Sequence, residues 1–175
     1  MIRKILIANR GEIAVRIIRA CSEMGIRSVA IYSDADRFSL HVKKADEAYS
    51  LGSDPLTGYL NVHRIVNLAV STGCDAVHPG YGFLSENPEL AEACARRGIT
   101  FIGPTAEVIQ RMGDKTEARD AMKAAGLPVT PGSDGNLDSI DDALVLAEKL
   151  GYPTIPKTDK SAQMAGDSTG IIDLR

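Results

Sequence analysis

The sequence of 175 residues lacks a strong excess of charge of either sign, because 20 lysines and arginines face 23 aspartates and glutamates, a net charge of -3. Composition therefore gives no reason to expect nucleic acid or an anionic membrane as a partner. The sequence also lacks an apolar run long enough to span a bilayer, and the first predicted strand follows Met1 at once, which leaves no room for a signal peptide. We expect a cytoplasmic protein, or a mitochondrial one whose presequence is not part of this sequence.

Cysteine and histidine are scarce as well. Cys21, Cys74 and Cys94 are far apart, form no C-x-x-C pair and have no set of histidines near them. Buried thiols in a reducing compartment are the expected state, not disulfides or metal ligands. His63 stands alone within a predicted helix, so we expect a surface residue there.

The sequence does contain a strong first β-turn-α pattern. The apolar run 5–8 predicts a strand buried on both faces, as in parallel sheets covered by helices. Gly11 marks a tight turn, and residues 12–24 predict a helix that ends at Gly25. The turn would lie at the carboxyl end of a central strand, where open α/β sheets bind ligands.

The predicted helix carries its charges on one stripe. Glu12, Arg16, Arg19 and Glu23 recur at spacings of four, three and four. Nearly all other positions are apolar, so we expect the helix to bury an unusually wide arc. The stripe is either a solvated face on which Arg19 and Glu23 pair, or a face that meets another layer or subunit. The residues alone favour the solvated face.

A second strand is predicted at 27–32, with Asp34 and Asp36 just after it. An acidic residue at this place holds the ribose in dinucleotide sites. Such a site needs a first turn of the form G-x-G-x-x-G, whereas this turn has only Gly11. We therefore expect the two aspartates to be turn or cap residues that bond nearby backbone amides.

The following pattern alternates strands with helices. Further strands are predicted at 47–51, 74–77 and 99–102, helices at 39–45, 62–73 and 89–97, and a loop at 52–58. We count four of the predicted strands as alternating with helices, the last of them at 99–102. This alternation predicts an α/β fold with a doubly wound parallel sheet. Later helices are predicted at 105–112, 115–125 and 139–150, the second capped by Asp114, with a domain boundary near Gly113.

The segment 78–88 is a glycine-containing loop that leads into a helix from Pro88. It could be a tight turn on which Tyr81 and Phe83 pack down. We favour a functional loop, because the segment is longer than packing requires and brings together a histidine, a tyrosine, a serine and a glutamate. These four residues are His78, Tyr81, Ser85 and Glu86.

Three stretches closely resemble the amino-terminal part of biotin carboxylase, the ATP-grasp component of acetyl-CoA, propionyl-CoA, methylcrotonyl-CoA and pyruvate carboxylases. They are KILIANRGEIA at 4–14, HPGYGFLSEN at 78–87 and MGDK at 112–115. The resemblance runs from Met1 to about Tyr152. It implies a Rossmann-like domain that precedes the ATP-grasp fold at 1–113 and the start of an ATP-grasp domain at 114–152. The remaining residues, 153–175, diverge from the family, and we expect a poorly ordered tail because Val, Leu and aromatic residues are scarce after Lys157.

The resemblance also implies a chemistry. In this family ATP and bicarbonate form carboxyphosphate, whose CO2 passes to the ureido nitrogen of biotin on a carrier protein. The implied cofactors are ATP, Mg2+ and biotin. The implied partners are a second copy in a homodimer, the biotin carboxyl carrier protein or domain, and a carboxyltransferase. The parent would be an acetyl-CoA carboxylase subunit, in fatty acid biosynthesis, or a relative.

The resemblance assigns roles to individual residues. The Tyr81-Gly82 loop would face biotin and bicarbonate, with Glu86 helping to order that region. An ammonium group suits phosphate as a compact point charge, and two lysines match positions that contact ATP. These are Lys115 and Lys157. The stripe of Arg16, Arg19 and Glu23 matches the homodimer contact of the bacterial subunits, which reverses the preference for a solvated face.

The sequence departs from the family after Pro153. Pro156 removes an amide donor where a central strand should run, and Gly166 is the only glycine between 157 and 167, where a run of glycines should cradle phosphate. Residues 1–175 do not include the part of the family sequence that supplies the acidic metal ligands, the adenine pocket and the bicarbonate-holding lysine and arginine. We expect a truncated or frame-shifted product, or a fragment, that is inactive alone.

Two other functions stay open at this point. The chain could be a non-catalytic interaction fragment that pairs through Arg16, Arg19 and Glu23. It could also be an unrelated Rossmann-type nucleotide-binding protein, although the missing glycines argue against this alternative.

Overall fold

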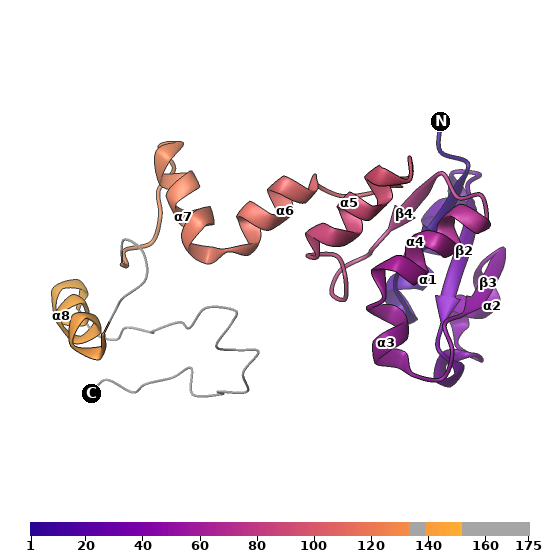
Figure 1. Ribbon diagram of the computed structural model, residues 1–175, viewed down its shortest axis with the longest axis horizontal. Helices are drawn as coiled ribbons and strands as arrows, with labels where there is room; N and C mark the ends of the chain where they lie inside the picture. The colour runs from indigo at the N-terminus through magenta and orange to yellow at the C-terminus, as the bar shows by residue number, and fades with distance from the viewer. Residues whose placement is uncertain (134–138, 152–175) are drawn as a thin grey trace. The chain divides into compact units, whose positions relative to one another are not determined.

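A computed structural model describes residues 1–133 and 139–151, and the chain divides into two units, 1–110 and 111–175 (Figure 1). The first unit contains a five-stranded sheet of order β3-β2-β1-β4-β5 in which every pair of neighbours is parallel. Its strands are β1 (Lys4–Ile7), β2 (Arg27–Tyr32), β3 (Glu47–Ser50), β4 (Ala76–His78) and β5 (Thr100–Phe101). This sheet confirms the expected α/β class and its doubly wound parallel topology.

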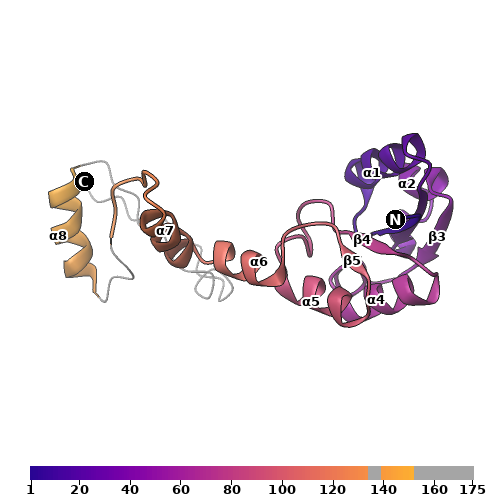
Figure 2. The ribbon, with the colours of Figure 1, turned by 90° about the horizontal axis from the view of Figure 1, so that it is seen from above.

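Helices cover both faces of the sheet (Figures 1 and 2). On one face lie α1 (Gly11–Glu23) and α2 (Leu40–Lys44); on the other lie α3 (Pro55–Tyr59), α4 (Val62–Ser71) and α5 (Pro88–Arg96). The single turn η1 (Asp34–Asp36) follows β2. Because successive side chains of a strand point to opposite faces, Ile5 and Ile7 pack with α1 while Leu6 packs with the helices of the other face.

The core is apolar on both sides of β1. Leu6, Val29 and Ile31 are fully buried among side chains of α4 and α5, and Ile18 of α1 is 4% exposed on the opposite face. The three cysteines are buried free thiols, as the sequence predicted. Burial raises the pKa of the Cys94 thiol to about 11, which keeps it protonated and unreactive at neutral pH.

The sheet order places a switch point beside β1. From β1 the chain winds outward through β2 to β3, and then returns to add β4 and β5 on the other side. Ile7 pairs with Ala30 on one side and with His78 on the other. In open α/β sheets, ligands bind in the crevice outside the carboxyl ends of the strands at such a point. The segments after β1 and β4 are therefore the first place to look for a site.

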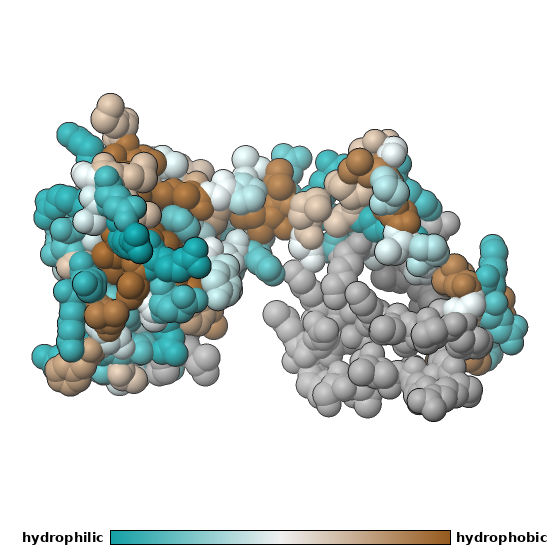
Figure 3. Space-filling view, turned by 180° about the vertical axis from the view of Figure 1, so that it is seen from behind, coloured by the Kyte–Doolittle hydropathy of each residue, from teal (hydrophilic) through white to brown (hydrophobic). Residues whose placement is uncertain are grey.

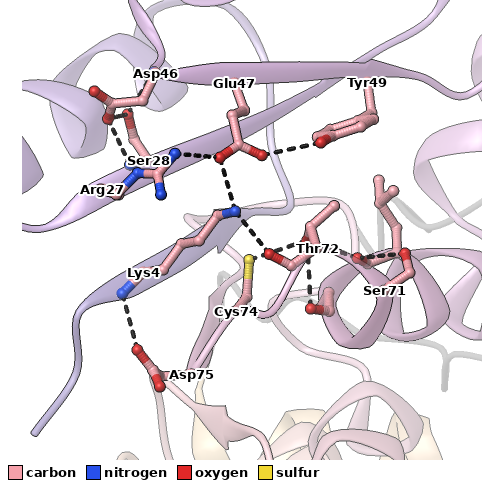
Figure 4. A network of polar contacts seen from close by, with 12 residues as sticks. Lys4, Arg27, Ser28, Asp46, Glu47, Tyr49, Ser71, Thr72, Cys74 and Asp75 are labelled. Carbon is pink, nitrogen blue, oxygen red and sulfur yellow. Dashed lines mark hydrogen bonds and ion pairs between the residues drawn. The ribbon is translucent and has the colours of Figure 1, made fainter.

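The opposite, amino-terminal edge of the sheet is fastened by a polar network (Figure 4). The Lys4 Nζ lies 2.8 Å from Glu47 Oε1 and donates to the Thr72 carbonyl at 2.6 Å. The Asp75 carboxylate accepts two backbone N–H bonds from the start of β1, at 2.8 and 3.0 Å. The Ser28 hydroxyl donates to Asp46 at 2.8 Å. These bonds tie β1, β2 and β3 together far from the switch point.

The second unit is helical in its described part. It contains α7 (Lys115–Ala124) and α8 (Ile140–Leu150), while α6 (Ala106–Gly113) crosses the boundary between the units. The Asp114 carboxylate accepts bonds from Thr116 N and Glu117 N, and Ser139 caps α8 through Asp142 N. The Asp114 cap was predicted, because a short polar side chain before a helical pattern satisfies the first free amides.

Three expectations about the fold are corrected. The segment 52–58 was expected to be a loop, yet α3 begins at Pro55, because proline suits the first turn of a helix and the buried Tyr59 anchors its end. The sheet has five strands where four were counted, since β3 also joins it. The arc buried by α1 is narrower than expected, because only Ala14, Ile18 and Cys21 are buried.

Within the described part of the chain, no helix is long and apolar enough to cross a bilayer.

Candidate functional site

Asn9 lies at the centre of the candidate site, directly after β1. Its side chain is only 1% exposed. The Nδ2 group donates to the carbonyls of Pro79 and Tyr81 at 2.7 and 2.9 Å, and the Oδ1 atom accepts from Arg10 N at 2.9 Å. Asn9 therefore links the end of β1 to the loop after β4, which lies 70 residues further along the chain.

The loop after β4 has an unusual backbone. Gly80, Gly82 and Phe83 have φ angles of 67°, 69° and 46°. Positive φ is ordinary for glycine but rare for an aromatic residue, in which it costs about 1–3 kcal/mol and persists only where the surroundings hold it. A Cβ atom at Gly80 would lie 2.7 Å from both Asn9 Nδ2 and Ile13 Cγ2, so only glycine fits there.

An open pocket of about 330 Å³ lies between the two segments, lined by residues 9–13 and 81–83. Tyr81 is 67% exposed at its rim, so its ring is free to contact a ligand, whereas Phe83 is 44% exposed and stacks its ring on Tyr59. The loop thus combines both interpretations of its sequence, since the Phe83 ring stacks on Tyr59 while the Tyr81 ring faces solvent. Arg10 and Glu12 bring one charge of each sign to the same pocket.

A chain of polar contacts extends from the pocket to η1 and α3. Arg10 Nη1 donates to both oxygens of Asp36 at 2.9 and 2.7 Å, and Tyr59 Oη donates to Asp36 Oδ2 at 2.9 Å. The Tyr59 ring stacks on Phe83 with centroids 5.3 Å apart and planes 5° from parallel. Asp36 was expected to bond backbone amides, and this was wrong, because side chains from distant segments reach it first.

The electrostatics of this chain of contacts follow from burial and pairing. Burial alone would raise the pKa of Asp36, but the hydrogen bonds from Arg10 and Tyr59 lower it below its usual value. Asp36 is therefore a carboxylate at neutral pH. Burial is the largest cause that raises the pKa of Tyr59 to about 12, and its bond to Asp36 adds to the effect. Tyr59 therefore keeps its proton and remains a donor.

The other loop residues have different roles. His78 Nδ1 accepts from Gly80 N at 3.0 Å, and burial lowers the pKa of His78, so the ring is neutral and shapes the turn. Glu86 is exposed and Ser85 is half-buried. The structure therefore brings His78 and Tyr81 to the loop beside Asn9 and leaves Glu86 at the surface near the start of α5.

The stripe on α1 is exposed. Arg19 Nε donates to Glu23 Oε1 at 2.8 Å, with the two side chains 80% and 63% exposed, and Arg16 is also exposed. Figure 3 shows the face of the first unit that α1 and α2 cover, where hydrophobic side chains lie among hydrophilic ones. Ile13, Val15 and Ile17 of α1 are only half-buried, so this helix keeps apolar surface beside its charges.

The two lysines assigned to ATP are not placed by the structure. The helix α7 begins at Lys115, but the described part of the molecule does not include that side chain, and Lys157 lies outside the described residues. Within 1–133 and 139–151, no group of three or more His, Cys, Asp or Glu side chains is arranged to hold a metal ion.

Sequence reasoning missed the residues that hold the site together. Asn9, Arg10 and Tyr59 received no role, because their contacts join segments far apart in the sequence. One local signal was available for Asn9. A polar amide that directly follows a fully buried strand needs buried partners, and a neighbouring loop with several free carbonyls can supply them.

Comparison with known families decides the relationship. The sequence profile described as "Biotin carboxylase, N-terminal domain" matches residues 1–109, which is more than half of the chain. The chain belongs to the biotin carboxylase family. A second profile, "Carbamoyl-phosphate synthase L chain, ATP binding domain", matches residues 114–173. Membership of the biotin carboxylase family replaces the alternative of an unrelated dinucleotide-binding protein.

Individual relatives agree with this assignment. A biotin carboxylase of Halalkalibacterium halodurans is 58% identical over 158 residues, which cover 90% of this chain and 35% of that protein. The crystal structure of the Hydrogenobacter thermophilus 2-oxoglutarate carboxylase biotin carboxylase domain dimer, with MgADP, ADP and bicarbonate, is 53% identical with a TM-score of 0.86. That match covers 90% of this chain and 35% of the solved one.

A further solved biotin carboxylase, the β,γ-ATP complex from Campylobacter jejuni, is 46% identical with a TM-score of 0.86, and the match covers 90% of this chain and 36% of that one. The chain therefore spans about a third of the length of the biotin carboxylases that it matches.

Proposed function

We propose that this chain forms the amino-terminal part of an ATP-dependent biotin carboxylase and supplies one wall of its biotin and bicarbonate site. In that reaction ATP and bicarbonate form carboxyphosphate, and its CO2 passes to the ureido nitrogen of carrier-bound biotin. The observation that carries the proposal is the meeting of the Asn9 turn and the Tyr81-Gly82 loop at the switch point of a biotin carboxylase fold. The exposed ring of Tyr81 and the charged residues Arg10 and Glu12 border that pocket.

The domain organisation is part of the same proposal. We place the change from the first domain to the start of the ATP-grasp domain near Gly113, and the unit boundary after residue 110 and the profile matches at 1–109 and 114–173 support it. Lys115 and Lys157 are proposed as the ATP-contacting lysines, since the solved relatives bind ADP or an ATP analogue. Glu86 is proposed to help order the loop from the start of α5.

The 175 residues by themselves are expected to be inactive, because the relatives carry about two thirds of their length beyond the matched part. A chimera tests the proposal. Residues 1–151 replace their counterpart in the Halalkalibacterium halodurans biotin carboxylase, and ADP formation is measured with and without bicarbonate and biotin. We expect the chimera to form ADP in a reaction that depends on bicarbonate and biotin, and the 175-residue chain to form none. A folded chimera that forms no ADP in response to bicarbonate and biotin would contradict the proposal. Bicarbonate-dependent ATPase activity of the 175-residue chain would contradict the expectation that the chain alone is inactive.

The same proposal covers the parent complex. We keep the expectation of a cytoplasmic acetyl-CoA carboxylase that works with a biotin carboxyl carrier protein and a carboxyltransferase. In this family the carboxyltransferase selects the acceptor, so purification of the native complex and identification of its carboxyltransferase test the choice. A carboxyltransferase for 2-oxoglutarate or pyruvate would replace acetyl-CoA as the acceptor.

A second candidate function is dimerisation through α1. The exposed pair of Arg19 and Glu23 beside half-buried apolar residues favours it, and a solved relative is a dimer. Sedimentation at micromolar concentration tests it with Arg19→Glu, which we expect to convert a dimer into a monomer. Arg96→Glu on α5 is the matched control, because Arg96 and Glu92 form a similarly exposed pair four residues apart. Equal masses for wild type and Arg19→Glu would exclude this surface.

A further inference from the structure

The loop that carries Tyr81 and Gly82 makes a few hydrogen bonds of its own, and residues outside it contribute further contacts to its shape. Phe83 has a positive φ of 46° within four residues of Gly80, and Tyr81 between the two glycines is largely exposed. A conformation of this kind persists only where neighbouring groups fix it from outside. The structure shows two such supports, and both begin at the end of β1.

The first support is the buried amide of Asn9. Its two N–H groups are used by the Pro79 and Tyr81 carbonyls, which flank Gly80, and its Oδ1 atom accepts from Arg10 N. A side-chain amide offers two donors and an acceptor on one small group, and no other short side chain does so. An aspartate here would set a carboxylate against two carbonyl oxygens. The contact therefore depends on the amide nitrogen and not on the volume of the side chain.

The second support begins at Arg10, the next residue. Its guanidinium holds Asp36, Asp36 accepts the Tyr59 hydroxyl, and the Tyr59 ring stacks on Phe83. The backbone N–H of Ser33 also donates to Tyr59 Oη at 3.2 Å, which fixes the ring from a second direction. Phe83 is thus held in its positive-φ conformation through two intervening side chains.

We infer that Asn9 and Arg10 are positioning residues that together set the conformation of the 79–83 loop, Asn9 by direct bonds to its carbonyls and Arg10 through Asp36, Tyr59 and Phe83. The two residues lie between the end of β1 and the start of α1, so they are fixed to the rigid centre of the fold. The catalytic consequence, alignment of Tyr81 and Gly82 toward biotin, rests on the proposed function. The structural coupling does not depend on it.

Amide hydrogen exchange of the 175-residue chain, resolved by NMR, tests the coupling. The reporters are Gly80 N–H, which bonds His78 Nδ1, and Ser85 N–H, which bonds the Gly82 carbonyl. Loss of the Asn9 bonds in Asn9→Ala is expected to speed exchange at both reporters by at least about tenfold, the factor that one ordinary hydrogen bond represents. Ser28→Ala is the matched control, because it removes a buried hydrogen-bonding side chain at the opposite edge of the same sheet.

The outcomes separate clearly. Faster exchange at the reporters in Asn9→Ala, with unchanged exchange in Ser28→Ala, supports the inference. Equal changes in both variants would overturn it, because they would show that Asn9→Ala only lowers the stability of the whole fold. If Asn9→Ala does not fold, Arg10→Ala carries the test, since that side chain is 48% exposed and its removal spares the core. We expect Arg10→Ala to speed exchange at Ser85 and Arg10→Lys, which keeps the charge, to restore part of the protection. No change at Ser85 in Arg10→Ala would overturn the second support.

The chimera described above connects the coupling to catalysis. Arg10→Ala in the chimera is expected to raise the KM for biotin severalfold with a smaller effect on kcat, because the loop is displaced while the ATP site is untouched. Changed exchange in an inactive chimera would refute the proposed function and leave the coupling. An active chimera with unchanged exchange in both variants would refute the coupling and leave the function.

Discussion

The Tyr59 hydroxyl is a sensitive test of the contacts beneath the loop, because Tyr59→Phe removes one oxygen and keeps the ring that stacks on Phe83. Tyr59 is 2% exposed, accepts from Ser33 N at 3.2 Å and donates to Asp36 at 2.9 Å. In Tyr59→Phe the buried Ser33 N–H loses its acceptor, and an unsatisfied buried donor costs about 1–3 kcal/mol. The bond from the hydroxyl to the charged Asp36 is also lost, and a bond of this kind contributes about 1.5–3 kcal/mol. Since Asp36 keeps its bond to Arg10, we expect Tyr59→Phe to lower the free energy of unfolding by about 2–4 kcal/mol in total.

Urea denaturation followed by circular dichroism measures this loss, and Tyr49→Phe is the control. The Tyr49 hydroxyl also donates to a carboxylate, Glu47 at 2.9 Å, but Tyr49 is 36% exposed. Its removal is therefore expected to destabilise the fold clearly less than removal of the Tyr59 hydroxyl. If the two variants lost equal stability, the reasoning about the buried hydroxyl would be refuted.

The same hydroxyl predicts a dependence on high pH. The pKa of Tyr59 is raised to about 12, so the folded chain keeps this proton at pH values where an unfolded tyrosine, with a usual pKa of 10.0, has lost it. The contribution of Tyr59 to stability is therefore complete below pH 10 and declines as the pH rises toward 12. Tyr59→Phe should lose this decline, and an unchanged alkaline profile would contradict the assignment.

Further predictions concern acid, glycine and thiol chemistry. Burial lowers the pKa values of His41 and His78 below the usual 6.5, so the unfolded chain binds protons first as the pH falls. Urea midpoints should therefore decline below pH 6.5, and each histidine should contribute up to about 1.4 kcal/mol per pH unit. A flat profile from pH 7.5 to 5 would contradict this prediction. Gly80→Ala should destabilise by clearly more than Gly82→Ala, because both have positive φ but only Gly80 has atoms 2.7 Å from an added Cβ; equal urea midpoints would show that the Asn9 contact yields. Cys94 should resist Ellman's reagent in the folded chain at pH 8 and react in urea, since its thiol is buried with a pKa of about 11, and fast reaction without urea would refute this.

The sequence predicted the local elements well because local signals determine them. The run 5–8 followed by Gly11 located β1 and the start of α1 to within one residue, and the strand at 27–32 was placed without error. Asp114 was recognised as a cap for the same reason, since a cap bonds amides two or three residues away. The loop with Tyr81 and Gly82 was expected directly after the strand at 74–77, and it follows β4 in the structure.

What the sequence could not predict are contacts between distant segments. Nothing local pairs Asn9 with the Pro79 carbonyl or Arg10 with Asp36, and these pairs form only when the sheet order brings β1 between β2 and β4. The expected loop at 52–58 was wrong for a related reason. Two glycines and a proline suggested a turn, but burial of Tyr59 against the sheet stabilises one short helix.

The central claim is that the exposed ring of Tyr81, at the switch point of the sheet, faces biotin in the assembled enzyme. Steady-state kinetics of the chimera with free biotin as the acceptor test this claim most directly, comparing Tyr81→Ala with Tyr49→Ala. One lost aromatic contact of about 1–1.5 kcal/mol predicts a KM for biotin about tenfold higher in Tyr81→Ala, with the KM for ATP unchanged and Tyr49→Ala like the parent. A KM for biotin that is the same in Tyr81→Ala as in the parent chimera would contradict the account.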